Sequence, residues 1–129
     1  MHVFTNGCFD ILHRGHVQYL SWAACHGRLT VGLNSDASVR RLKPGRPINT
    51  ESDRAFVLRA LRCVDNVVMF EEDTATELVL RLRPDIYVKG GDYSMNTPEA
   101  KAVRSYGGSV VSAPFLGGYS TTALIERLR

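Results

Sequence analysis

Strand-type and helix-type segments alternate along the chain from one end to the other. The strand-type segments are short and apolar, and residues 29–33 are nearly all apolar, as in a strand buried on both faces. Between them, apolar residues recur at helical spacing. This order predicts one α/β domain over residues 1–129, with a parallel sheet covered by helices on both faces. The five expected strands are 3–5, 29–33, 66–70, 86–88 and 109–111.

Glycine, proline and capping residues mark where the expected helices begin and end. The first helix is expected from Val17 to near Gly27, and Thr50 with Asp53 resembles a capping box at the start of another. Residues 42–50 contain two prolines and a glycine, so we expect a loop there. Further helices are expected after a cap at 34–36 and at 74–82, 98–106 and 123–128.

Composition argues against several classes of protein. The net charge is only +3 and no run of lysine and arginine occurs, so a nucleic-acid partner is not expected. The three cysteines form no CxxC pair, which favours a reducing compartment over a disulfide framework. No apolar run reaches transmembrane length and no signal peptide is visible, so we expect a cytoplasmic protein without a membrane partner.

Polar clusters follow several expected strands. They occupy residues 5–7, 34–36 and 89–92, and a further one at 120–122 lies beyond the fifth strand. In open α/β sheets, ligands bind at the carboxyl ends of the strands. The sequence therefore predicts that these separated segments converge on one crevice.

The segment His13-Arg14-Gly15-His16 is the sharpest local motif. Two histidines three residues apart at the opening of a helix lie on one face, and Gly15 leaves room for a phosphate to approach the backbone. The helix N-terminus adds free N–H groups and a positive dipole. Histidines in this place can donate to phosphate oxygens and stabilise charge that grows in a transition state. The alternatives are an incidental surface pair or a metal pair, although a zinc site needs more ligands than these two histidines.

Residues 5–16, TNGCFDILHRGH, resemble the N-terminal motif of the HxGH nucleotidyltransferases, the cytidylyltransferase-like family, and Ser120-Thr121-Thr122 resembles that family's C-terminal element. The resemblance covers nearly the whole chain and implies a Rossmann-like, doubly wound five-stranded sheet. Residues 34–36, 46–47 and 89–93 resemble the heptose 1-phosphate adenylyltransferase branch.

The resemblance implies roles for individual residues. His13, His16 and Lys43 are the expected catalytic residues, with the imidazoles binding the triphosphate and stabilising the transferring phosphoryl group. The expected nucleotide-binding residues are Thr5, Asn6, Gly7, Cys8, Phe9, Gly15, Lys89, Gly90, Asp92, Ser120, Thr121 and Thr122. The expected acceptor-binding residues are Asp10, Asn34, Asp36, Arg46, Arg54 and Tyr93.

Several of these residues also have simpler readings. Cys8 can be a small packing residue, Asn34 and Asp36 can cap a helix, and Arg54 can be a solvated helix residue. The resemblance also implies Mg²⁺, bound mainly through the triphosphate, with Asp10 as the side chain considered for a further contact.

The expected reaction is transfer of AMP from ATP to a sugar 1-phosphate, with heptose 1-phosphate giving ADP-heptose for lipopolysaccharide. The acceptor phosphate is already a nucleophile, so positioning and charge stabilisation carry the catalysis. A cytidylyltransferase acting on glycerol 3-phosphate or a related alcohol phosphate is the alternative, and a non-catalytic nucleotide-binding module is the second. The resemblance further implies a homodimer, and a sugar kinase activity supplied by another chain.

Overall fold

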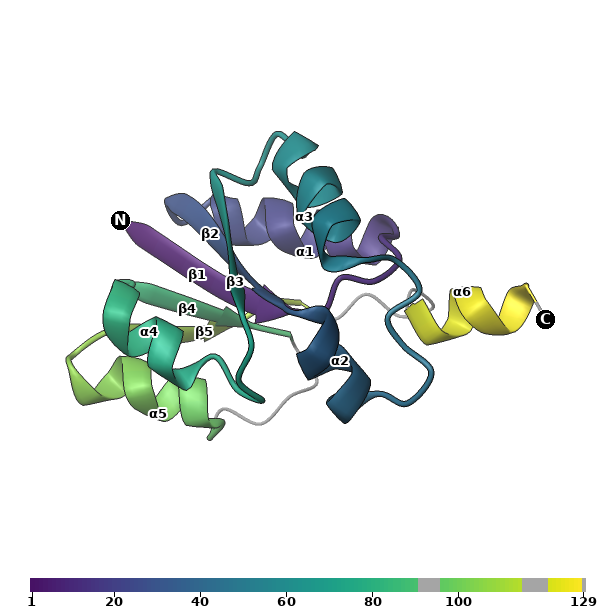
Figure 1. Cartoon of the computed structure of the whole chain (residues 1–129). Coiled ribbons are helices and arrows are strands. Elements are labelled where there is room, and N and C mark those ends of the chain that lie inside the picture. The colour runs from purple at the N-terminus through teal and green to yellow at the C-terminus, as the bar shows by residue number, and fades with distance from the viewer. Residues whose placement is uncertain (91–95, 115–120, 129) are drawn as a thin grey trace.

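The computed structural model describes residues 1–90, 96–114 and 121–128, and it contains one five-stranded sheet flanked by helices (Figure 1). The strand order is β3-β2-β1-β4-β5, and every neighbouring pair is parallel, which confirms the predicted architecture. The strands are β1 (His2–Gly7), β2 (Arg28–Asn34), β3 (Asn66–Phe70), β4 (Ile86–Lys89) and β5 (Ser109–Ser112). The helices are α1 (Arg14–Ala24), α2 (Asp36–Leu42), α3 (Glu51–Ala60), α4 (Thr76–Leu82), α5 (Pro98–Ser105) and α6 (Thr121–Arg127).

Two apolar clusters, one on each face of the sheet, form the core. Side chains alternate across β1, so that Val3 joins the cluster under α1 and α3 while Phe4 joins the cluster under α4 and α5. Figure 1 shows these two pairs of helices on opposite sides of the sheet. Both clusters contain fully buried aliphatic side chains, among them Leu20 and Leu29 on one face and Val79 and Val103 on the other. The β1 strand is therefore buried from both sides.

Several elements begin or end away from the expected residues. Helix α1 begins at Arg14, three residues before the expected Val17, because the His13 side chain caps it. Ser35 caps α2, and Thr50 caps α3 by accepting the Asp53 N–H at 3.3 Å, as the sequence indicated. Helix α4 begins at Thr76 rather than 74.

The order of the strands creates a switch point beside β1. The chain builds β2 and β3 on one side of β1 and then returns to add β4 and β5 on the other. The helices that follow β1 and β4, α1 and α5, therefore lie on opposite faces of the sheet, and in such sheets ligands bind at the carboxyl ends of the strands at this point. Gly7 ends β1 and Lys89 ends β4, so both reach this edge of the sheet.

Candidate active site

The turn after β1 folds Phe9 beneath the histidine motif. Phe9 has a left-handed backbone (φ 46°), and its largely buried ring lies 5.4 Å from the His16 ring, centroid to centroid. A Cβ on Gly7 would meet the Phe9 ring at 2.9 Å, so the close approach depends on glycine at that position. The turn therefore supports the buried side of His16.

His13 and His16 cap helix α1 reciprocally. The Nδ1 of His13 accepts the Gly15 N–H at 3.1 Å, and the Nδ1 of His16 accepts the His13 N–H at 3.3 Å. The two rings stack with their centroids 3.9 Å apart. This is a capping box built from two imidazoles, and it fixes both rings at the helix N-terminus.

These hydrogen bonds also fix where each ring carries its proton. A neutral imidazole has one N–H and one acceptor nitrogen, and in both rings the acceptor is Nδ1. The proton of each ring therefore lies on Nε2, which becomes a hydrogen-bond donor. The motif thus presents two Nε2–H donors beside the free amides of a helix N-terminus.

Burial keeps both imidazoles neutral, and nearby positive charge adds to this effect at His16. Burial, then the charges of His13 and Lys43, lowers the pKa of His16 to about 4. Burial also lowers the pKa of His13. At neutral pH both rings are therefore uncharged and can donate hydrogen bonds from Nε2.

Lys43 lies close enough to His16 to act on it electrostatically. It caps the C-terminus of α2, its side chain is exposed, and its charge contributes to the lowered pKa of His16. Burial raises the pKa of Cys8, and the charge of Lys43 opposes that change. His13 and His16 are therefore in contact and Lys43 lies within electrostatic reach of His16, while the thiol of Cys8 stays protonated at neutral pH.

Asp10 holds the loop between α2 and α3. Its carboxylate is 4% exposed and accepts the N–H groups of Ile48, at 2.9 and 3.0 Å, and Asn49, at 2.9 Å. The Asn49 side chain returns a hydrogen bond to the Asp10 carbonyl at 2.7 Å. The family resemblance implied that Asp10 contacts the acceptor. In the structure its carboxylate instead accepts hydrogen bonds from amides of the loop.

Arg54 is also buried, so the alternative that it is a solvated helix residue is wrong. It donates from α3 to the carbonyls of Cys8, Asn34 and Asn49 at 2.8 to 3.0 Å, and to the Asp36 carboxylate at 2.8 Å. Its side chain has no exposed surface. Arg54 therefore ties the ends of β1 and β2 to the loop and to α2.

Asn34 and Asp36 lie where β2 passes into α2. Asn34 is buried and donates to the Ser38 hydroxyl at 3.0 Å, which in turn donates to the Glu72 carbonyl. Asp36 stands in the first turn of α2, and its N–H donates to Glu51. Ser35, rather than either of these residues, supplies the side-chain cap of the helix.

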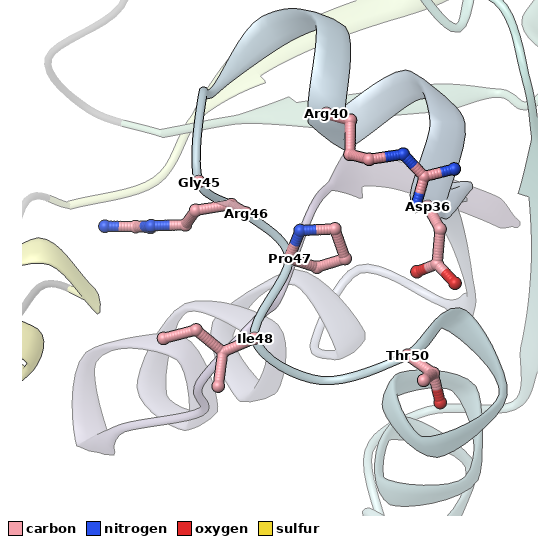
Figure 2. A pocket seen from close by; sticks show the side chains of 7 residues that line it. All are labelled: Asp36, Arg40, Gly45, Arg46, Pro47, Ile48 and Thr50. Carbon is pink, nitrogen blue, oxygen red and sulfur yellow. The ribbon is translucent and has the colours of Figure 1, made fainter.

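A pocket of about 320 Å³ opens between α2 and the 45–48 loop (Figure 2). Figure 2 shows Asp36 and Arg40 on its α2 side, while the Arg46 side chain extends away from Asp36. Its size matches small-molecule sites. Sequence reasoning missed Arg40, although its spacing of four residues from Asp36 places both on one face of α2. The lining residues are Asp36, Arg40, Gly45, Arg46, Pro47, Ile48 and Thr50.

The side chains at the end of β1 are tied to β4. Thr5 is fully buried, and its hydroxyl bonds to the Val88 carbonyl at 2.9 Å and to the Tyr19 hydroxyl. Asn6 accepts the Tyr87 hydroxyl at 2.5 Å. Burial raises the pKa of Tyr87, so that hydroxyl remains a donor. The sequence did not single out either tyrosine, because aromatic side chains in such segments usually serve the core.

The remaining candidates divide between described and undescribed parts of the chain. Lys89 is half-buried at the end of β4, and Gly90 follows it. Thr121 and Thr122 begin α6. Asp92, Tyr93 and Ser120 lie outside the described residues.

Within 1–90, 96–114 and 121–128, no three His, Cys, Asp or Glu side chains gather as a metal site. Over the same ranges, no helix has the length and apolar character that a membrane span needs.

Comparisons with known proteins agree with the resemblance noted in the sequence. Residues 4–127 match the family model described as Cytidylyltransferase-like. A D-beta-D-heptose 1-phosphate adenylyltransferase of Bordetella bronchiseptica is 57% identical, over 98% of this chain and 81% of that protein. The "Bifunctional protein HldE" of Syntrophotalea carbinolica is 58% identical over 98% of this chain, which spans only 26% of that longer protein.

Solved structures share the fold. A lipopolysaccharide core biosynthesis protein from Thermoplasma volcanium GSS1 superposes with a TM-score of 0.76 at 29% identity, over 88% of this chain and 96% of that one. A protein of unknown function from Archaeoglobus fulgidus, at 21% identity and a TM-score of 0.69 over 93% of this chain and 94% of that one, supports the fold alone.

Proposed function

This chain belongs to the cytidylyltransferase-like family, and from that premise we propose that it transfers AMP from ATP to a sugar 1-phosphate. Heptose 1-phosphate is the proposed acceptor, and ADP-heptose and pyrophosphate are the products. The names of its relatives in Bordetella bronchiseptica and Syntrophotalea carbinolica support this acceptor. We take residues 1–129 as one nucleotidyltransferase domain.

The observation that carries the proposal is the neutral imidazole pair. Two Nε2–H donors, fixed by the α1 cap and accompanied by the Lys43 charge, suit the oxygens of a triphosphate. The reaction increases negative charge around the α-phosphorus and on the leaving pyrophosphate. Donors that are already aimed there stabilise the transition state without reorganising.

The chemistry is a single in-line displacement. An oxygen of the acceptor phosphate forms a bond to the α-phosphorus of ATP while the bond from that phosphorus to the bridging oxygen of the β-phosphate breaks. Pyrophosphate leaves with the electron pair of the broken bond. The acceptor oxygen is already ionised at neutral pH, so no general base is needed, which fits two imidazoles whose pKa values are lowered.

We assign the nucleotide to the side of the crevice formed by the turn after β1, the end of β4 and the start of α6. In this assignment backbone groups of residues 6–9 contact the nucleotide, and Lys89 and Gly90 face it from β4. The family resemblance is the ground for assigning Asp92 to the base, and Ser120, Thr121 and Thr122 to the triphosphate. Thr5 contributes through its backbone, because its hydroxyl is committed to Val88 and Tyr19.

We assign the acceptor to the side bounded by α2 and the 45–48 loop. Arg40 and Arg46 line the pocket there and supply positive charge for a phosphorylated sugar, while Asp36 and Thr50 supply hydrogen-bond partners for hydroxyl groups. Tyr93 is a further proposed acceptor contact.

Mg²⁺ is the proposed cofactor. Hard divalent ions of this size are usually held by substrate phosphates and water with few protein ligands. When bound with ATP it neutralises charge on the leaving pyrophosphate. Asp10 is not needed for this, because its carboxylate already accepts loop amides.

We further propose a cytoplasmic homodimer. Three free cysteines and an ATP substrate fit the cytoplasm. Phe56 on α3 is 76% exposed and Met69 on the edge strand β3 is 40% exposed, so a second copy has apolar side chains to cover. Light scattering of the wild type should give twice the mass of the chain. The Phe56→Asp variant should have the mass of one chain. A wild-type protein with the mass of one chain would contradict the dimer.

The activity is tested by a panel of ATP and CTP against heptose 1-phosphate, other sugar 1-phosphates and glycerol 3-phosphate, read as pyrophosphate release. Release with ATP and heptose 1-phosphate is the expected result. Pyrophosphate release only with the combination of CTP and glycerol 3-phosphate would establish the cytidylyltransferase alternative. Nucleotide binding without turnover of any acceptor would indicate a binding module.

A further inference from the structure

The loop that forms one wall of the pocket is held from behind by two buried charged side chains. Pro47 and Ile48 face the pocket of Figure 2, and Asn49 follows them toward the start of α3. Asp10 lies at the end of the turn after β1, and Arg54 lies in the second turn of α3. Both bond to this short segment from the side of the core, so its position depends on residues that are distant in sequence.

Asp10 acts on the backbone of the segment. Its carboxylate accepts two consecutive amides, those of Ile48 and Asn49, within 3.0 Å. Consecutive amides that converge on one carboxylate fix the direction of the chain between them, and charge-assisted hydrogen bonds of this kind are strong. The Asn49 side chain closes the ring by donating to the Asp10 carbonyl.

Arg54 connects the same segment to three other parts of the fold. Its Nε donates to the Asn49 carbonyl, and one terminal nitrogen donates to both Cys8 and Asn34. The other terminal nitrogen pairs with Asp36, which lines the pocket. Four of the five N–H groups of this guanidinium are therefore used inside the protein.

We propose that Asp10 and Arg54 are positioning residues: a buried clamp that fixes residues 47–49 and thereby shapes the acceptor pocket, without contacting the acceptor. The acceptor part of this inference rests on the proposed function. It replaces, for these two residues, the direct acceptor contact that the family resemblance implied. The burial of both side chains and their commitment to protein partners are the reasons.

Two kinds of measurement test the clamp. Amide hydrogen exchange at Ile48 and Asn49 reports the clamp in the full chain without any substrate. Steady-state kinetics report its effect on the site through the separate KM values for ATP and for the sugar phosphate. The test variants are Asp10→Asn, Arg54→Lys and the milder Asn49→Ala. The matched controls are Asp73→Asn and Arg41→Lys, which alter an exposed ion pair on the outer side of α2.

In Asp10→Asn, exchange at Ile48 and Asn49 should rise by about tenfold or more, while the central β2 amides of Val31 and Leu33 stay protected. Arg54→Lys should have the same effect on Asn49, because a lysine keeps the charge but not the fork of donors. KM for the sugar phosphate should rise by about tenfold or more in both variants, with KM for ATP changed far less. Asn49→Ala should show the same pattern more weakly, and the controls should match wild type.

The outcomes separate the two hypotheses. Unchanged exchange at Ile48 and Asn49 in Asp10→Asn and Asn49→Ala overturns the clamp, whether or not the enzyme turns over. Faster exchange with an unchanged KM for the acceptor overturns its role in the pocket. A further variant, Arg54→Met, removes the charge of the side chain. If Arg54→Lys has wild-type exchange and a wild-type KM for the sugar phosphate, while Arg54→Met raises that KM without changing exchange, then Arg54 binds the acceptor through its charge. That result would contradict the proposal. Absence of any turnover in the wild type refutes the proposed function, while the exchange data still decide the clamp.

Discussion

The imidazole rings of His13 and His16 stack with their centroids 3.9 Å apart, and each ring accepts a backbone N–H of the helix turn that it begins. The same hydrogen bonds that cap α1 leave Nε2–H as the outward donor of each ring. Local folding and the proposed catalytic geometry therefore depend on the same contacts. Substitutions that separate the two roles are the most informative.

Replacement of His16 by glutamine should preserve much of the cap, since glutamine also serves at this position of a capping box. The glutamine amide still carries N–H donors, but with its oxygen accepting the His13 N–H it does not place one where the imidazole Nε2–H lies. We expect kcat to fall by about 10²- to 10³-fold, the range seen for loss of one transition-state donor. Circular dichroism and thermal unfolding should stay close to wild type. His26→Gln, at the other end of α1 where His26 bonds the Trp22 carbonyl, is the control. Wild-type kcat in His16→Gln would contradict the proposed role.

The lowered pKa of His16 should make folding stability depend on pH over a defined window. In the unfolded chain this ring takes up a proton near pH 6.5, whereas in the folded chain it does so only near pH 4. The unfolded state therefore binds more protons between these values, and the free energy of unfolding should fall as the pH drops from 6.5 to about 4. Urea unfolding of wild type and His16→Gln across this range measures the difference. Parallel curves for the two proteins would contradict the lowered pKa.

Lys43 should affect both turnover and the neighbouring imidazole. Lys43→Ala removes a positive charge from the proposed phosphate site, and we expect kcat/KM for ATP to fall by about tenfold or more. Because this charge helps to lower the pKa of His16, the same variant should raise that pKa, which an NMR titration of the ring detects. Lys101→Ala, an exposed change on α5, is the matched control. If Lys43→Ala has a wild-type kcat/KM for ATP and an unchanged His16 pKa, Lys43 lies outside the site.

Removal of divalent metal should stop the reaction without weakening the fold. Chelation by EDTA is expected to abolish pyrophosphate release, and excess Mg²⁺ should restore it, because in the proposed reaction the metal enters with the triphosphate. The melting temperature of the protein without nucleotide should be the same with and without EDTA. A large fall in that temperature would reveal a structural metal and contradict this account.

The architecture and the histidine pair were predictable because they depend on local patterns. Alternating strand and helix periodicities specified the parallel sheet, and the spacing of His13 and His16 specified a shared helix face. The start of α1 was predicted three residues late for a physical reason. An imidazole is not among the usual N-cap side chains, so His13 did not mark the helix boundary.

The commitments of Asp10 and Arg54 were not predictable, because their partners are main-chain groups distant in sequence. Asp10 bonds amides 38 and 39 residues away, and Arg54 bonds a carbonyl 46 residues away. Residue type gives the charge of a side chain but not which carbonyl or amide the fold brings to it. Arg40 was missed for a related reason, since only the folded loop turns that face of α2 into a pocket wall.

The most direct test of the central claim is a crystal structure with Mg²⁺ and an ATP analogue whose α–β bridging oxygen is replaced by a methylene group. We predict that Nε2 of both His13 and His16 lies about 2.7–3.2 Å from phosphate oxygens, with Nδ1 of each ring still accepting its backbone N–H. A triphosphate bound elsewhere, or rings that turn their Nε2 atoms away from it, would contradict the account.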